Sequence, residues 1–170
     1  MARIAYPDPS NKETASLVNR IIAERGRLAN LYRMLLHSPS VAEGWLSFLT
    51  AIRHRCSFSG RIRELVILQI AVINGAEYEF RAHEPIALKE GVTQQQIDAL
   101  RLGDLSCFDA LDHNVLTYCE SMTRDVQVPD DVFNAVRIHF SEKEIVELTA
   151  TIAAYNLVSR FLEAIKIDHE

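Results

Sequence analysis

Residues 61–75 read RIRELVILQIAVING, and this stretch decides the fold that the sequence predicts. Nearly every residue from 65 to 73 is apolar, so a helix formed here has no polar face. A helix that is apolar all round is normally buried at the centre of a protein. Gly75 ends it, because glycine adopts the left-handed conformation of a helix C-cap at little cost. The sequence therefore predicts a central, buried helix over residues 61–73.

The rest of the chain has apolar residues at helical spacing and no alternating strand pattern, so the predicted fold class is all-α. We expect one domain with an extended arm (1–10), N-terminal helices (11–56) and a core (57–170). Gly26 should interrupt the first helical stretch, and Pro85 should kink the helix that begins at Glu77. The other expected helices span residues 12–35, 41–54, 94–100, 110–123, 130–140 and, after a capping box at 141–144, a stretch up to 164.

Composition and charge exclude several classes of protein. A net charge of −5 argues against a nucleic-acid-binding protein, which needs a basic face. No basic run suits a membrane surface, and the longest apolar run is about half a membrane span. Cys56, Cys107 and Cys119 are far apart and odd in number, which fits a reducing compartment. With no apolar signal core at the N-terminus, we expect a cytoplasmic protein that binds neither nucleic acid nor membrane.

Glu64 lies in the first turns of the central apolar helix. A carboxylate at this place is held by the helix N-terminus and a nearby arginine, or it stands at the mouth of a cavity. The sequence leaves both interpretations open, a structural acid and a functional one.

Glu79 and His83 are four residues apart on one predicted helix, so their side chains project from the same face. A carboxylate beside an imidazole raises the histidine pKa and fixes its tautomer, as a general acid or base requires. The same spacing also occurs in solvated surface pairs. Glutamate and histidine are zinc ligands as well, but no recognised metal motif accompanies them, and we expect no metal.

Three stretches resemble the core of the carboxymuconolactone decarboxylase-like family, which includes the alkylhydroperoxidase D-like (AhpD-like) proteins. They are RIRELVIL at 61–68, GAEYEFRAH at 75–83 and FSEKEIVEL at 140–148, with Gly91-Val92 between the last two. Residues 30–35, NLYRML, and the following His37-Ser38-Pro39 are similar to the N-terminal helices of the longer members. The resemblance spans residues 23–162 and implies an AhpD-like helical bundle.

The peroxidase branch of this family carries a Cys-x-x-Cys pair, a histidine four residues beyond the second cysteine, and an upstream glutamate that completes a proton relay. On that pattern the glutamate falls on Glu64 and the histidine on His83, whereas the cysteines fall on Ala76 and Glu79. Both thiols are missing, and with them the disulfide chemistry of a peroxidase.

What is left of the pattern is similar to the decarboxylase side of the family, which works without metal or organic cofactor. We therefore expect a cofactor-free acid–base enzyme, a lyase or relative, with Glu64, Glu79 and His83 as catalytic residues. It would decarboxylate, isomerise or hydrolyse a small carboxylated lactone or carbonyl compound. An anionic substrate also requires a cation. The candidate substrate-binding residues are Arg81, Arg63, Arg33 and Tyr78.

Two other functions stay open. One is a peroxiredoxin-type antioxidant protein, which the missing cysteine pair disfavours, and the other is a non-catalytic protein that binds a small ligand. The resemblance also implies a homo-oligomer, either a trimer or a hexamer made of trimers, which amphipathic helices permit.

Overall fold

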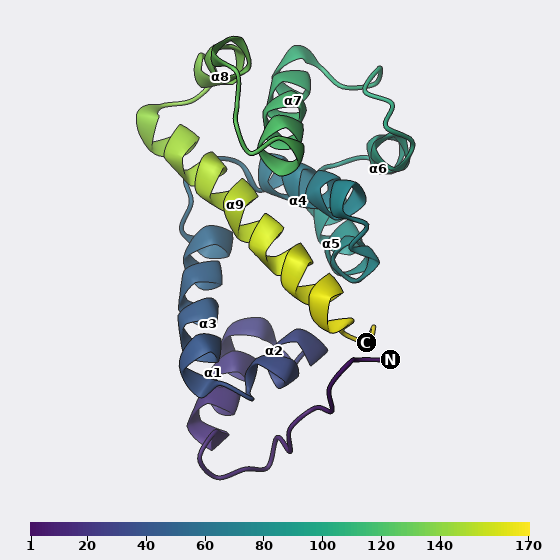
Figure 1. The fold of residues 1–170 in the computed structure, drawn as a ribbon. Coiled ribbons are helices and arrows are strands. Elements are labelled where there is room, and N and C mark those ends of the chain that lie inside the picture. Colours follow the sequence, from purple (N-terminus) through teal and green to yellow (C-terminus); the bar gives the residue numbers. More distant parts are fainter. The chain divides into compact units, whose positions relative to one another are not determined.

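The computed structural model describes all residues from 1 to 170, and its regular elements are all helices (Figure 1). The all-α prediction is confirmed. Contacts within the chain define two compact units, residues 1–55 together with 162–170, and residues 56–161. The second unit contains the three predicted catalytic residues.

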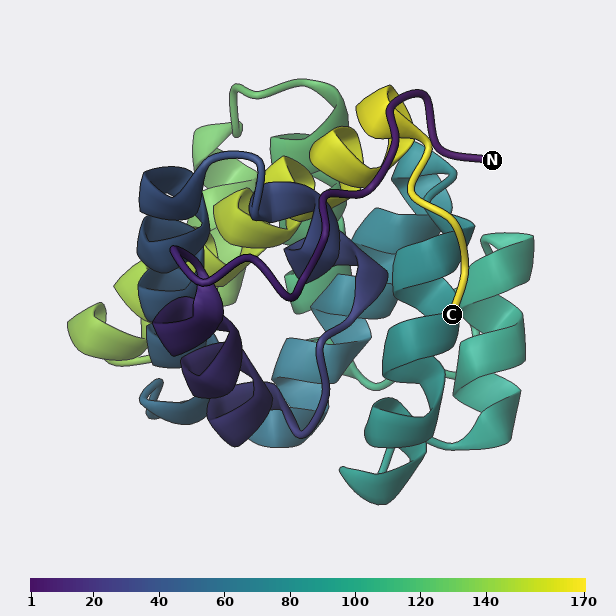
Figure 2. The ribbon, with the colours of Figure 1, turned by 90° about the horizontal axis from the view of Figure 1, so that it is seen from below.

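The first unit contains three helices and both ends of the chain. The helices are α1 (Ala15–Arg25), α2 (Asn30–Leu35) and α3 (Pro39–His54). Gly26 ends α1 with a φ of 78°, so the predicted interruption is confirmed. The N-terminal arm runs beside the C-terminal tail (Figure 2), where the Arg3 N–H donates to the Ile165 carbonyl at 2.9 Å.

The second unit is built around α4, which packs against the three helices that follow it in the chain. Its helices are α4 (Gly60–Asn74), α5 (Glu77–Lys89), α6 (Gln94–Leu102), α7 (Ala110–Arg124), α8 (Asp130–Arg137) and α9 (Glu142–Ile165), the last of these up to residue 161. Residues 64–71 of α4 are all buried, which confirms the predicted central helix. Leu65 and Leu68 pack with Phe80 of α5 and Leu116 of α7 in one apolar core.

A very short connection joins α4 to α5. Gly75 caps α4 with a φ of 66°, and the Ala76 N–H donates to the Ala71 carbonyl at 2.8 Å. α5 begins at Glu77, so the chain reverses within two residues and α5 packs directly against α4. At the other end of α4, the Ser59 hydroxyl accepts the Ile62 N–H at 3.2 Å and so caps the helix.

α9 is long and apolar enough, by length and composition alone, to cross a membrane. A mostly buried core helix passes the same test, and 56% of its most apolar stretch is buried. Polar contacts also join it to α4, because the Asn74 amide donates to the Ser159 hydroxyl at 2.7 Å and to Asn156 Oδ1 at 3.1 Å. The cytoplasmic location stays a prediction.

Four helix ends differ by two or three residues from the predicted ones, and each has a local cause. The first helix begins at Ala15 because the Asn11 side chain accepts the Glu13 N–H and forms a competing turn. α3 begins at Pro39, whose fixed φ suits a first helical position. α6 runs on to Leu102 because Gly103 provides its C-cap. α8 stops at Arg137, since the next N–H groups bond only three residues back.

Adding one methyl group should have opposite effects at two glycines. Gly75→Ala should lower the free energy of unfolding by about 1–2 kcal/mol, because alanine is strained at positive φ. Gly44→Ala, at an exposed site inside α3 with open space around the new atom, should raise it by about 0.5–1 kcal/mol. Urea unfolding followed by circular dichroism measures both. Equal effects at the two sites would show that the left-handed turn after α4 is not required.

Candidate active site

Glu64, Glu79 and His83 converge inside the second unit. His83 Nδ1 lies 2.6 Å from Glu64 Oε2, and its Nε2 lies 3.2 Å from Glu79 Oε1. The three side chains are almost completely enclosed, with 1%, 5% and 3% of Glu64, Glu79 and His83 exposed. We call these three residues the relay.

Two helices hold the relay in place. Glu64 is on α4 and is followed by the buried apolar residues of the core. Glu79 and His83 are on the buried side of α5, one helical turn apart. Because Phe80 of α5 packs with Leu68 of α4, the reversal at Gly75 brings the imidazole against the Glu64 carboxylate. The sequence pattern predicted the pair on α5 but could not give its distance from Glu64.

The geometry favours a protonated imidazole. A carboxylate only accepts hydrogen bonds, so two carboxylates on opposite ring nitrogens require an N–H at both. Burial alone would lower the pKa of His83, but the hydrogen bonds and charges of Glu64 and Glu79 outweigh it and raise the pKa above its ordinary 6.5. Burial alone would raise the pKa of Glu64, but His83 and then Arg63 outweigh it and hold that pKa below its ordinary 4.5.

Two further side chains support the relay. The Arg63 Nε donates to Glu64 Oε1 at 3.0 Å, so Glu64 has a cationic partner on each oxygen. The Tyr155 ring of α9 packs edge-on to the His83 ring, with centroids 5.2 Å apart, and limits how the imidazole can rotate. Sequence spacing gives no sign of Tyr155, because it comes from a helix far along the chain.

The other candidate substrate-binding residues lie in different surroundings. Arg81 is exposed and donates to Glu77 at 2.8 Å, one turn back on α5. Tyr78 is buried on the same helix. Arg33 belongs to the first unit, where it donates to Asn30 and its guanidinium carbon lies 4.7 Å from the Tyr6 ring centroid. Arg63 contacts the relay through Glu64, and the role of all four residues in binding substrate stays a prediction.

The cysteines do not form a redox pair. None of the three forms a disulfide, and burial raises the pKa of the Cys119 thiol far above its ordinary value. Burial and then the charge of Glu147 raise the pKa of Cys56. A raised pKa lowers the thiolate fraction, so neither thiol is activated.

No group of three or more His, Cys, Asp or Glu side chains in residues 1–170 has the arrangement of a metal site. In the relay, both nitrogens of His83 are turned to carboxylates on opposite sides of the ring, instead of sharing a common point with them. The zinc alternative therefore has no support from the geometry of these side chains.

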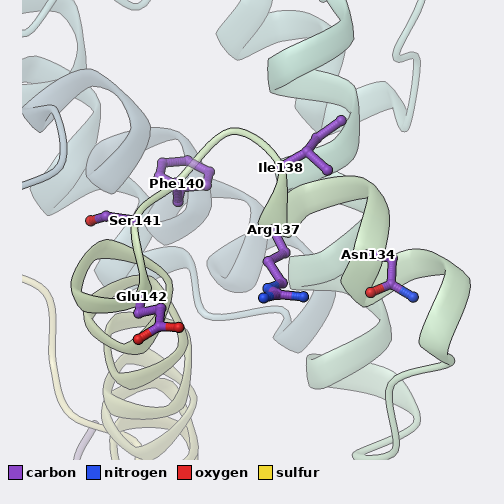
Figure 3. Close-up of a pocket in the computed structure, with 6 residues that line it drawn as sticks. All are labelled: Asn134, Arg137, Ile138, Phe140, Ser141 and Glu142. Atoms are coloured by element: carbon purple, nitrogen blue, oxygen red, sulfur yellow. The ribbon is translucent and has the colours of Figure 1, made fainter.

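A separate hollow of about 390 Å³ lies where α8 leads into α9 (Figure 3). Its walls are formed by Asn134, Arg137, Ile138, Phe140, Ser141 and Glu142. No relay residue lines this hollow, and no sequence pattern predicted it.

Known proteins show similarity to this chain in sequence and in fold. Residues 39–111, which contain the whole relay, match the carboxymuconolactone decarboxylase family. The match supports the assignment of this chain to the carboxymuconolactone decarboxylase-like family. Within curated proteins, it is similar to the uncharacterized protein YdfG of Bacillus subtilis, with 27% identity over 107 residues, which are 61% of this chain and 73% of that protein.

Several solved structures share the fold of this chain. A peroxidase-related protein from Silicibacter sp. has a TM-score of 0.85 at 18% identity, covering 99% of this chain and 92% of that one. The alkylhydroperoxidase AhpD core from Ralstonia eutropha has a TM-score of 0.84 at 16% identity, with 99% and 92% covered. The debrominase Bmp8, in complex with 2,3,4-tribromopyrrole, has a TM-score of 0.82 at 15% identity, covering 100% of this chain and 94% of that one. At these identities the likeness shows the AhpD-like fold alone.

The relay should make stability depend on pH on both sides of a maximum. Glu64, with a lowered pKa, stabilises the fold above about pH 4.5 and loses this effect as pH falls through its folded pKa. His83, with a raised pKa, stabilises it below about pH 6.5 and loses this effect as pH rises through its folded pKa. Both contributions are complete only between these two values.

His83→Gln should therefore cost most stability between about pH 4.5 and 6.5, by about 3–5 kcal/mol, because two buried carboxylates lose their shared cation. Guanidinium unfolding of both proteins from pH 4 to 9 measures the difference. A difference that is the same at every pH would mean that His83 is neutral in the folded protein.

Proposed function

We propose that this protein is a cofactor-free acid–base enzyme in which Glu79 exchanges a proton with the substrate. The observation that carries the proposal is the buried relay, in which His83 stands between Glu64 and Glu79 at 2.6 Å and 3.2 Å. Glu79 is the most exposed of the three and has the longer contact, so it is the member best placed to meet a substrate. Glu64 and Arg63 lie on the other side of the imidazole and hold its orientation.

The relay can supply the proton that a decarboxylation needs. When carbon dioxide leaves a carboxylated lactone or carbonyl compound, the carbon–carbon bond breaks and its electron pair passes into the adjacent carbonyl. The proton then moves from His83 Nε2 to Glu79 and from Glu79 to the carbon, leaving a neutral imidazole that still donates from Nδ1 to Glu64. Solvent restores the proton afterwards. Isomerisation or lactone hydrolysis would use the same groups, with Glu79 first accepting a proton.

Two observations support an acid–base enzyme over a peroxidase-type antioxidant protein. The positions that resemble the redox cysteines are Ala76 and Glu79, both buried in the second unit. The actual cysteines lie elsewhere, and the pKa values of Cys56 and Cys119 are raised instead of lowered. Neither of these two thiols is activated for disulfide chemistry.

A small-ligand-binding protein without turnover is the second candidate. The favouring observation is that both nitrogens of His83 are already bonded inside the chain, as they would be in a purely structural ion network. The two candidates differ in whether the wild-type protein converts a ligand that it binds.

A homotrimer or a hexamer also stays a proposal. Several apolar side chains of the second unit are exposed, among them Ile138, Val146 and Leu157, and an interface between copies would cover such residues.

Glu79→Gln should lower turnover by about a hundred- to ten-thousandfold, the usual contribution of a general acid or base. The fold should be retained, because a glutamine oxygen still accepts from His83 Nε2. Glu84→Gln, an acid on the same helix outside the relay, is the matched control and should keep wild-type turnover. Mass spectrometry of carboxylated lactones incubated with each protein measures conversion.

The double variant Glu79→Gln/His83→Gln should be little slower than either single variant, since the two residues act as a unit. Full turnover by Glu79→Gln would contradict the role of Glu79, whereas a folded wild-type protein that binds a lactone and converts none would support the ligand-binding candidate.

Replacing all three cysteines by serine should leave lactone conversion nearly unchanged, because no thiol takes part in the relay. Circular dichroism should confirm that the variant is folded, since Cys119 is buried and its Sγ donates to the Val66 carbonyl. The wild-type protein, given a dithiol reductant and cumene hydroperoxide, should reduce no peroxide above the reagent blank. A robust peroxidase rate that disappears in the variant would contradict the proposed function.

A further inference from the structure

Arg63 keeps most of its hydrogen-bond donors unused although it is largely enclosed. Its Nε donates to Glu64, and its Nη1 and Nη2 groups form no hydrogen bond within the chain. Only 15% of the side chain is exposed. A guanidinium has five N–H donors in a planar fork that matches a carboxylate or phosphate group. The Nη edge is therefore a partly buried cation with room for an acceptor.

Glu90 offers the nearest carboxylate to this edge but does not satisfy it. Its Oε1 lies 3.7 Å from Arg63 Nη2, which is an ion pair but too long for a hydrogen bond. The Glu90 side chain is 38% exposed and follows the last residue of α5, so water screens the pair. Such a contact is weak and easily exchanged.

Gly60 leaves the space in which the Glu90 carboxylate sits. An added Cβ at Gly60 would overlap Glu90 Oε2 and would stand 3.2 Å from Arg63 Nη2. Gly60 is the first residue of α4, where backbone N–H groups and the helix dipole also favour an anion. Glycine, the guanidinium edge and a carboxylate thus meet at one place.

We propose that Arg63 and Gly60 form a subsite for a carboxylate of the substrate that lies away from the reacting carbon, and that Glu90 is an internal carboxylate which the substrate displaces. The inference rests on the proposed function in one respect, that the substrate is a small organic acid. Exchanging one carboxylate for another leaves the charge beside Glu64 unchanged, so binding would not disturb the relay. The incoming group gains hydrogen bonds that Glu90 does not form.

Benzoate and its neutral analogue benzamide are suitable probes, with binding followed by NMR titration of the ¹⁵N-labelled protein. The wild-type protein should bind benzoate in preference to benzamide. Glu90→Gln should bind benzoate about two- to fivefold more tightly, the range expected when a solvent-exposed competing ion pair is removed. Glu84→Gln, on the same helix, should bind like the wild type.

Two variants of the subsite should have the opposite effect. Gly60→Ala should abolish the preference for benzoate while staying folded. Alanine is favoured in a helix, and its methyl group only fills the space that the carboxylate occupies beside Gly60. Arg63→Lys keeps the charge but lacks the planar fork, and should weaken benzoate by about tenfold or more, as expected for lost charge-assisted hydrogen bonds. Unchanged benzoate affinity in Glu90→Gln, or a retained preference in folded Gly60→Ala, would overturn the subsite.

This test is separate from the test of the relay. Glu79→Gln should bind benzoate like the wild type even where it has lost turnover. If Glu79→Gln stays fully active while Glu90→Gln tightens benzoate binding, the subsite stands and the proposed reaction fails. If turnover depends on Glu79 but benzoate and benzamide bind alike to every variant, the subsite fails and the relay stands.

Discussion

The charge on His83 exists only because two carboxylates are buried with it. Removing an imidazolium or a carboxylate from water costs several kcal/mol for each ion, and only close partners recover that cost. Glu64 and Glu79 provide those partners on opposite ring nitrogens, and Arg63 provides one for the second Glu64 oxygen. Much of the second unit serves this constraint, since α4, α5 and α9 each enclose the imidazole from a different direction.

The relay also changes what the family's fold can do at this place. Where the peroxidase branch resembled by the sequence carries its second cysteine, this chain has Glu79, and the neighbouring histidine now contacts a carboxylate instead of a thiol. A thiol can be oxidised and reduced, whereas a carboxylate can only gain or lose a proton. Under the proposed function, this chain would use for proton transfer the glutamate and histidine that the resemblance assigns to a redox relay in the peroxidase branch.

The sequence predicted the parts of the site that depend on one helix at a time. The apolar run of α4, the stop at Gly75 and the four-residue spacing of Glu79 and His83 are all local patterns. The contacts of His83 with Glu64 and Tyr155 depend on how helices pack, and no local spacing encodes that. From side-chain size alone, His83→Gln would lose activity but keep nearly the same melting temperature, because glutamine fills similar space. The structure predicts a loss of stability as well, since two buried carboxylates would be left without the imidazolium.

The tight turn between α4 and α5 has a consequence for how the protein folds. Glu64 and His83 are 19 positions apart, and the turn at Gly75 and Ala76 lies between them. Contacts over so short a separation close small loops, which costs little chain entropy and favours rapid formation. The two helices can therefore find each other while distant parts of the polypeptide are still unpaired. The charged centre then belongs to the part of the chain that forms early, and α9, which brings Tyr155 from far along the sequence, encloses it later.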